Sequence, residues 1–457
     1  MVTTGNGRPI VLITIDSLRA DHLGAYGYGR NTSPHIDALA AQGVRYAQAI
    51  SNGGGTPEAF PSILGGVSPP IHWQEYREIF RHRPTIAHIL RDAGYETAAF
   101  HSNPYLSRWF HYHRGFDLFD DGMTKLTPEQ AFLLEDDWPQ RARGIFRLFN
   151  RMRSLYRGWS PPIVKAEDLN EKVISWLRAR SRKFFLWIHY MDVHYPYKPP
   201  PLYLRLLGAP PVNSWRMLGL YYQLRRNPHG LSPRDLQILV NLYDACIRYV
   251  DDAIGSLLAE LQKKWPEAAI VLTADHGDAF GDHGRFSHDS LYEELLRVPL
   301  VVAGGGTKSG TVVAEQVSLR GISDAILSLV GLGRPGLWGG SQAVSTASPV
   351  PREERVFSVC LNPSQKRRLI SCRTEGWKYI RIEDMEAGCL VGEELYYLKA
   401  DPRETRNVVE DEPDKAQEFR VRVDGFLAAT EQKRSRTLHE MERIAKRVRR
   451  LKSLGGP

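Results

Sequence analysis

The sequence predicts an α/β protein with a mostly parallel central sheet, and three observations lead to this prediction. Short apolar, β-branched segments alternate with longer amphipathic segments up to about residue 350, which is the rhythm of βαβ units. Several of the short segments are apolar throughout, as in strands that are covered on both faces. Beyond about residue 350 short strand-like segments follow one another closely, which predicts a small C-terminal antiparallel sheet.

The size and composition fit one large domain with a smaller appendage. The chain has 457 residues, of which 42% are hydrophobic, and this is enough to bury a large core. Its four cysteines lie far apart, without the spacing of a metal finger or a disulfide framework, which favours a reducing compartment. We see neither a signal-like N-terminal segment nor an apolar run of bilayer length. We therefore expect a soluble, cytoplasmic protein without a transmembrane segment.

The first predicted strand covers residues 10–15 and ends at Asp16. A loop follows, and Ser33-Pro34 then opens an amphipathic helix whose apolar positions extend to Val44. A carboxylate directly after a buried strand is either a turn or helix cap, or a ligand, because open α/β sheets bind ligands at their strand ends.

A glycine-rich turn precedes the next predicted helix. The glycines at 53–55 free the backbone to turn, and Pro57 suits the first helical position, which puts Thr56 at the expected N-cap. The N–H groups at such a helix start favour an anion, here at Gly54 and Gly55. The Thr56 hydroxyl therefore either caps the helix or acts as a nucleophile directed into an anion site.

The middle of the chain repeats the alternation of strands and helices. The predicted elements are helices over 84–94, 168–180 and 233–264 and strands over 96–100 and 184–190. Residues 122–165, rich in Arg and aromatic side chains, are interpreted as an insertion over one face. The strand at 184–190 is followed by Asp192 and His194, which are either ligands or ordinary members of a Pro-rich turn.

A further strand, residues 269–273, leads directly into Asp275 and His276 and a Gly-rich segment that runs to His288. Asp and His side chains at one strand end are natural ligands of a divalent metal, although a turn cap and a surface histidine would give the same pattern. Residues 298–303 form the last predicted strand of this part.

We predict three domains, with boundaries at 1–348 for the catalytic domain, 349–415 for the antiparallel subdomain and 416–457 for a basic helical tail. The antiparallel strands are expected near 356–359, 368–373, 377–382 and 394–398, and helix from 413 to about 452. Nine of the residues from 433 to 452 are Lys or Arg. The tail is either a solvated basic helix, or a surface that contacts an anionic partner or mediates oligomerisation.

The order of these segments resembles the sulfatase branch of the alkaline phosphatase superfamily. The matching segments begin with Ile13-Thr-Ile-Asp-Ser, Ser33-Pro-His-Ile-Asp, His189-Tyr-Met-Asp-Val-His, Thr273-Ala-Asp-His-Gly and Glu394-Leu-Tyr-Tyr-Leu. Each segment alone is weakly specific for the family, but the whole set in this order is highly specific and extends to about residue 415. The resemblance implies an alkaline-phosphatase-like, doubly wound sheet with helices on both faces and a metal held at the strand ends.

By position, the resemblance implies that Asp16, Asp275 and His276 hold a divalent metal. It places Thr56 at the nucleophile position beside that metal, as a further ligand of it. A divalent cation there would lower the pKa of the hydroxyl and neutralise an anionic substrate. The second acid of calcium-type sulfatases is missing, since Ser17 follows Asp16. Together with the histidine ligand, this favours Mn²⁺ or Zn²⁺, with Ca²⁺ or Mg²⁺ as alternatives.

The resemblance also implies roles for two further histidines. His194 and His288 are suited to bind the ester oxygens or to protonate the leaving group. Alternatively, either of them completes a second metal site together with Asp192, as in two-metal relatives.

The sequence departs from formylglycine sulfatases at the nucleophile. Those enzymes share a Cys/Ser-x-Pro-x-Arg motif, whereas this chain has Thr56, Glu58 and Phe60 at the Cys, Pro and Arg positions. A threonine nucleophile is instead similar to the phosphoryl-transferring branches, such as phosphodiesterases and phosphonate hydrolases.

These observations predict a metal-dependent hydrolase that cleaves a phosphate or phosphonate ester of a small molecule or glycan through a covalent Thr56 intermediate. The first alternative is a sulfate ester hydrolase that acts without formylglycine. The second is a non-catalytic anion-binding or interaction protein with the basic tail as its working surface. Residues 103–165 and 195–230 are expected to form the walls around the organic part of the substrate.

Overall fold

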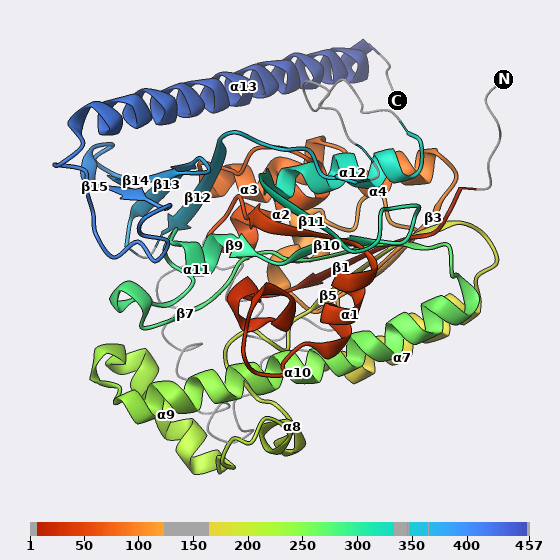
Figure 1. Cartoon of the computed structure of the whole chain (residues 1–457). Coiled ribbons are helices and arrows are strands. Elements are labelled where there is room, and N and C mark those ends of the chain that lie inside the picture. Colours follow the sequence, from red (N-terminus) through yellow and green to blue (C-terminus); the bar gives the residue numbers. More distant parts are fainter. Residues whose placement is uncertain (1–6, 123–163, 333–344, 346, 364, 455–457) are drawn as a thin grey trace, which may run out of the picture.

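A large mixed sheet forms the centre of the protein in the computed structural model, which describes residues 7–122, 164–332, 345, 347–363 and 365–454 (Figure 1). Its strands are β1 (Ile10–Ile15), β2 (Val44–Ile50), β3 (Glu96–Phe100), β4 (Leu118–Asp120), β5 (Phe184–Tyr190), β6 (Ala269–Ala274), β9 (Arg297–Val298), β10 (Leu300–Ala303) and β11 (Thr311–Ser318). The spatial order is β11-β2-β10-β6-β1-β5-β3-β4, with β9 paired to the end of β2. Only β9 and β10 run antiparallel to their neighbours among these described strands.

Helices cover both faces of this sheet, which confirms the predicted doubly wound α/β architecture (Figure 1). One face carries α1 (Pro34–Gln42), α7 (Ala166–Arg178) and α10 (Pro233–Lys264), and the other carries α2 (Thr56–Gly65), α3 (Trp73–His82), α4 (Ile86–Asp92) and α12 (Ile322–Leu329). The other α-helices in the described part of the chain are α8 (Pro201–Leu206), α9 (Ser214–Arg226), α11 (Glu293–Leu296) and α13 (Pro413–Leu454).

The central strands and the long helix follow directly from their sequences. Every residue of β1 and of β5 is buried, as expected for apolar strands inside a two-sided sheet. Helix α10 begins where predicted, because the Ser232 hydroxyl and the Asp235 carboxylate form a reciprocal capping box and Pro233 occupies the first turn. These elements form the rigid frame from which the site residues project.

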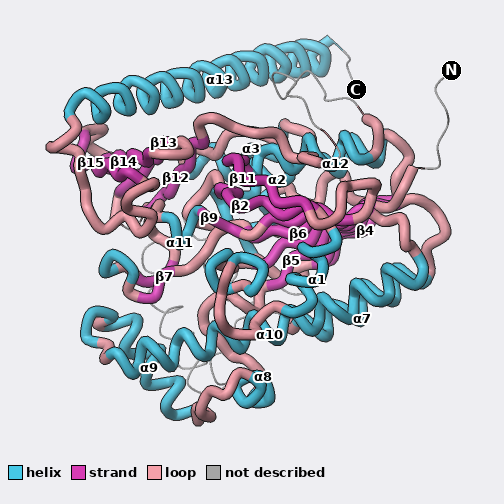
Figure 2. The backbone as a smooth tube through the Cα atoms, in the orientation of Figure 1, coloured by secondary structure: helices cyan, strands magenta, loops and turns pink. Residues whose placement is uncertain are grey.

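A second sheet lies beside the first and is antiparallel throughout, as predicted. It contains β12 (Val356–Asn362), β13 (Arg367–Arg373), β14 (Trp377–Asp384) and β15 (Leu390–Tyr397), in that order. Figure 2 shows α13 running above this sheet, and the side chains of Ala416, Phe419 and Val423 pack into its core. The three domain boundaries and the role of the basic tail stay predictions, and most of the insertion predicted at 122–165 lies outside the described residues.

Two expectations about strands and helices are wrong in detail. Val44 does not continue α1, because the helix ends with Gly43 as its C-cap. Val44 is instead the first residue of β2, a strand that the sequence pattern did not predict. Residues 298–303 are not one strand, because Pro299 lacks an N–H donor and separates β9 from β10. In the described part of the chain, no helix has both the length and the apolarity needed to cross a membrane.

Candidate active site

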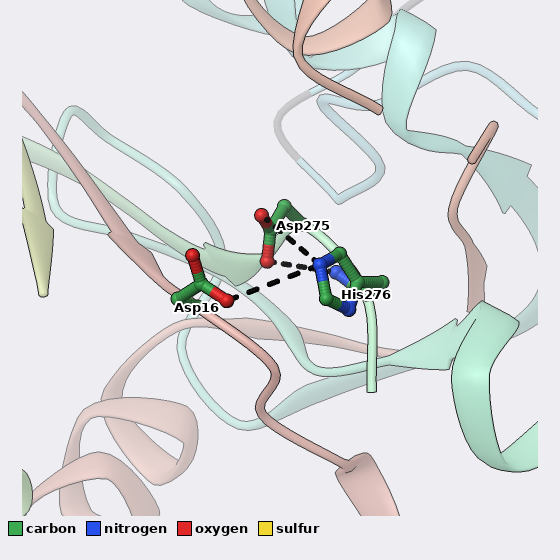
Figure 3. A group of neighbouring side chains, drawn as sticks. All are labelled: Asp16, Asp275 and His276. Atoms are coloured by element: carbon green, nitrogen blue, oxygen red, sulfur yellow. Dashed lines mark hydrogen bonds and ion pairs between the residues drawn. The ribbon is translucent and has the colours of Figure 1, made fainter. Parts of the chain in front are cut away.

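Two neighbouring strand ends bring together three of the four predicted metal ligands. Strands β1 and β6 are parallel, and the register pairs Ile15 with Ala274, so Asp16 and Asp275 leave the sheet side by side. Figure 3 shows the carboxylates of both residues pointing toward the ring of His276. The Nε2 atom of His276 lies 3.9 Å from Asp16 Oδ1 and 3.6 Å from Asp275 Oδ2. All three side chains are completely buried.

The donor set fits a divalent cation. One ligand atom from each of Asp16, Asp275 and His276 lies within 4.8 Å of the others, as atoms that share one metal would. The His276 Nδ1–H donates to the Gly277 carbonyl at 2.8 Å, which fixes the tautomer and leaves Nε2 as the free ligand atom. Two buried carboxylates without a cation between them would repel one another. This group could therefore hold the metal.

The pKa values of these three side chains are shifted, because their charges are buried close to one another. Burial and the adjacent Asp16 carboxylate raise the pKa of Asp275 above its ordinary value. Burial alone would lower the pKa of His276, but the carboxylates of Asp275 and Asp16 raise it. Burial also disfavours charge on Asp16, yet His194, His189 and His276 together hold its pKa below the ordinary value. Each pKa in this group therefore depends on the charges of its neighbours.

Thr56 lies directly beside the ligand group. Its hydroxyl donates to Asp275 Oδ2 at 2.9 Å and is 3.5 Å from His276 Nε2. The predicted N-cap role is wrong, because Gly55 is the N-cap and Thr56 is the first residue of α2. The hydroxyl is thus free of helix capping and is held against a carboxylate that can accept its proton. This geometry is compatible with a nucleophile at a helix N-terminus.

The small sheet forms hydrogen bonds with the loop that precedes Thr56, and these bonds rule out the anion-binding role predicted for Gly54. The N–H of Gly54 donates to the Val359 carbonyl at 3.1 Å, and the Ser358 hydroxyl donates to the Ser51 carbonyl at 2.6 Å. Gly54 is therefore not an anion donor, because β12 already uses its N–H. Gly55 stays a candidate, since the first N–H groups of a helix have no partner inside it.

Two side chains that contact the candidate site were given no role by the sequence reasoning. The Asn103 Nδ2 donates to Asp16 Oδ2 at 2.8 Å and lies 3.5 Å from Thr56 Oγ1. His189 Nε2 is 3.3 Å from the same Asp16 oxygen. Asn103 follows β3 as Asp16 follows β1, so the strand-end signal was present there too. His189 gave no such signal, because it lies inside β5 among apolar residues.

His194 and His288 extend the site away from the ligand group. The ring centroids of His276 and His288 are 4.9 Å apart, and those of His288 and His194 are 5.4 Å apart. The surrounding protein desolvates the His288 ring, and His276 and His194 repel an added proton, so the pKa of His288 is well below its ordinary value. The structure therefore brings both predicted histidines to the site.

Asp192 contacts the start of α7. Its Oδ1 accepts the N–H of Ala166 at the start of α7, at 3.3 Å. Burial raises the pKa of Asp192 to about 7. Among the described residues, the compact ligand group at this site contains Asp16, Asp275 and His276 but not Asp192. These contacts do not support the second metal site that was considered for Asp192.

Comparison with known proteins shows the family to which this chain belongs. The family model described as Sulfatase matches residues 8–332, which is more than half of the chain. The chain is 24% identical to "Arylsulfatase K" of Mus musculus over 431 residues, covering 83% of this chain and 72% of the relative. It is 25% identical to the "Arylsulfatase" of Clostridium perfringens over 370 residues, covering 71% of this chain and 75% of the relative.

Solved structures share the fold across nearly the whole chain. One was determined in complex with its substrate D-glucosamine-2-N,6-O-disulfate, and it has a TM-score of 0.68, 17% identity and coverage of 92% of this chain and 97% of that one. The phosphonate monoester hydrolase of Agrobacterium radiobacter has a TM-score of 0.64, 19% identity and coverage of 93% and 96%. Together with the family match, these findings identify a hydrolase that acts on ester bonds. The chain belongs to the sulfatase family.

Proposed function

We propose that this chain hydrolyses a sulfate ester, with Thr56 as the nucleophile and a divalent cation held by Asp16, Asp275 and His276. The observation that carries the proposal is the hydrogen bond from the Thr56 hydroxyl to Asp275 Oδ2, at 2.9 Å, inside a group of metal-ligand type. The sulfatase family match and the arylsulfatase relatives favour sulfate over phosphate or phosphonate, which was the first expectation from the sequence.

The chemistry follows from the positions of the side chains. Asp275 accepts the Thr56 hydroxyl proton, and Oγ1 attacks the sulfur as the bond between sulfur and the ester oxygen breaks. His194 and His288 protonate the departing oxygen and then deprotonate the water that attacks sulfur. As the bond between sulfur and Thr56 Oγ1 breaks, Asp275 returns its proton to Oγ1, which releases sulfate and restores the threonine. A bound divalent cation would supply positive charge for the sulfate oxygens, and Mn²⁺ or Zn²⁺ suits the histidine in the ligand set.

Hydrolysis of a phosphate or phosphonate monoester is the second candidate, and the residue at position 56 favours it. Threonine takes the place of the Cys or Ser from which formylglycine is made, and Glu58 and Phe60 replace the motif's Pro and Arg. Two structural neighbours are phosphonate monoester hydrolases. Either ester presents a tetrahedral anion to the same ligands, and the substrate is proposed to be a small molecule or a glycan.

A direct assay separates the two candidates. The protein is stripped of metal, reloaded with Mn²⁺ or Zn²⁺ and assayed with the 4-nitrophenyl esters of sulfate, phosphate and phenylphosphonate. Thr56→Ala and the conservative Thr56→Ser serve as a matched pair. We expect metal-dependent sulfate turnover that is lost in Thr56→Ala and partly retained in Thr56→Ser. Turnover of the phosphorus esters alone would select the second candidate, and equal activity of Thr56→Ala would refute the nucleophile in both.

A further inference from the structure

A group of metal-ligand side chains lies outside the candidate active site. It consists of His283, in the turn after the short strand β7 (Ala279–Phe280), Glu294 in α11, and Glu404, which follows β15. One ligand atom from each of the three residues lies within 4.8 Å of the others. Figure 1 shows β7 and α11 on the side of the molecule that carries the small sheet. The group therefore lies where the loop after β7 meets the segment after the small sheet.

The three side chains are placed as ligands of one ion would be. His283 Nε2 lies 3.7 Å from Glu294 Oε2. Two ligand atoms that are each about 2.0–2.2 Å from one zinc ion lie about 3–4 Å from one another. The Tyr292 ring stacks on the His283 ring, with centroids 3.8 Å apart and an angle of 16° between the planes, and this contact fixes the direction of the imidazole. An imidazole and two carboxylates are ligand types that Zn²⁺ accepts.

Glu294 is the residue that indicates a bound cation. Its side chain is only 8% exposed, and its Oε1 atom has no hydrogen-bond partner among the described residues. Its Oε2 atom is too far from the His283 ring for a hydrogen bond. The nearby Arg19 guanidinium is already paired with Asp21 and Asp282. A buried carboxylate without a counter-charge in contact is costly, and a cation between Glu294 and His283 would remove this cost.

The other cations near this group are also paired. Arg373 donates to both oxygens of Glu293 at 2.9 Å, and Lys378 Nζ lies 3.2 Å from Glu293 and 2.7 Å from Glu404. These two cations balance the charges of Glu293 and Glu404, so none of their charge is left for Glu294. Glu404 can still bind a metal, because a carboxylate has about four acceptor positions and the contacts with Lys378 and the Glu293 N–H occupy two of them.

We propose that His283, Glu294 and Glu404 bind a divalent transition-metal ion such as Zn²⁺, at a site separate from the candidate active site. The ion connects the loop that leads to His288 with the segment that follows the small sheet. His283 and Glu404 both have left-handed backbone conformations, with φ of 51° and 54°, which non-glycine residues adopt where the surrounding structure enforces them. Metal bonds to both side chains contribute to that constraint. The proposal does not depend on the proposed hydrolysis.

Counting bound zinc on the whole chain tests the site. Protein stripped with a chelator is dialysed against Zn²⁺, and the bound zinc per chain is measured by mass spectrometry of the element. His283→Phe keeps a ring that can stack on Tyr292 but removes the ligand atom, so it should bind one zinc ion fewer than the wild type. Combined with His276→Ala, which removes a ligand of the active site, it should bind none. His229→Phe changes an exposed histidine beside the same loop and should bind as much zinc as the wild type.

Thermal unfolding separates loss of the metal from loss of the fold. Added Zn²⁺ should raise the unfolding midpoint of His276→Ala, in which only the proposed site is intact, but not that of the same variant with Glu294→Gln. Without zinc, Glu294→Gln should unfold no earlier than its parent, because the buried charge is gone. This pattern would support the site even in a protein that hydrolyses no ester. Equal zinc in the wild type and His283→Phe, or a zinc-dependent rise that survives Glu294→Gln, would overturn the proposal.

Discussion

Replacing Glu58 by glutamine tests the electrostatics of the first turn of α2. Glu58 occupies the position of the motif's proline, and it is almost completely buried two residues after Thr56. Its Oε1 accepts the N–H of Leu361 at 3.0 Å, a bond that the Gln carbonyl preserves. Burial raises the pKa of Glu58 from 4.5 to about 7, because the ionised form is poorly solvated there. Glu58→Gln removes the charge and keeps the shape.

The sign and size of the effect follow from this raised pKa. Below the unfolded value both states hold the proton, so Glu58 costs no stability there. As the pH rises from 4.5 to about 7, the unfolded chain loses its proton first and the folded protein is progressively destabilised. Above that window the cost is constant at about 3 kcal/mol. Glu58→Gln should therefore stabilise the protein by about this amount at high pH and by almost nothing at low pH.

The assay is urea unfolding of metal-stripped protein, followed by tryptophan fluorescence at about pH 5 and about pH 8.5. Metal is removed because a nearby cation would stabilise the ionised carboxylate. Glu315→Gln, on the exposed part of β11, is the matched control and should not change the pH dependence. The reasoning is refuted if Glu58→Gln shifts the free energy of unfolding equally at both pH values.

Three further perturbations test the site and its support. Asp275→Asn should raise the thermal unfolding midpoint of the metal-free protein, because it relieves the repulsion between this carboxylate and Asp16. In thermal unfolding with metal at a hundred times its Kd, the same variant should lose the stabilisation of about 2.7 kcal/mol that the metal is expected to give. Asn103→Ala should lower kcat about tenfold to a hundredfold, since it removes the amide that donates to Asp16; unchanged kcat would contradict this role. Lys378→Met should cost about 3–5 kcal/mol in urea unfolding, because it leaves Glu404 unpaired in the interior, whereas the exposed Lys366→Met should have no measurable effect.

Strand ends were the most informative feature of the sequence for the site. The runs before Asp16 and Asp275 are apolar throughout, and such a run has no stable place except inside a two-sided sheet. Parallel strands place their carboxyl ends at one edge of a sheet, so the sequence alone groups the two acids. The same argument extends to Asn103 after β3, and the metal group of Asp16, Asp275 and His276 is the part of the prediction that the geometry supports most directly.

Elements with mixed patterns could not be recognised in the same way. Strand β2 alternates buried and half-buried residues, and its apolar start at Val44 also fits the helix period of α1. The donor role assigned to Gly54 failed because a distant segment, β12, takes its N–H. No local pattern shows which backbone groups a strand some three hundred residues later will use.

The sequence alone predicted the α/β class, the sulfatase resemblance and the three candidate metal ligands at the strand ends, because each depends on local apolar patterns and on residues that directly follow strands. Only the tertiary structure decided that Thr56 bonds Asp275 rather than capping a helix, that Asp192 faces α7, and that His194 and His288 lie next to one another. Those features arise where segments far apart in the chain meet, and their contacts depend on register and side-chain direction, which periodicity does not encode.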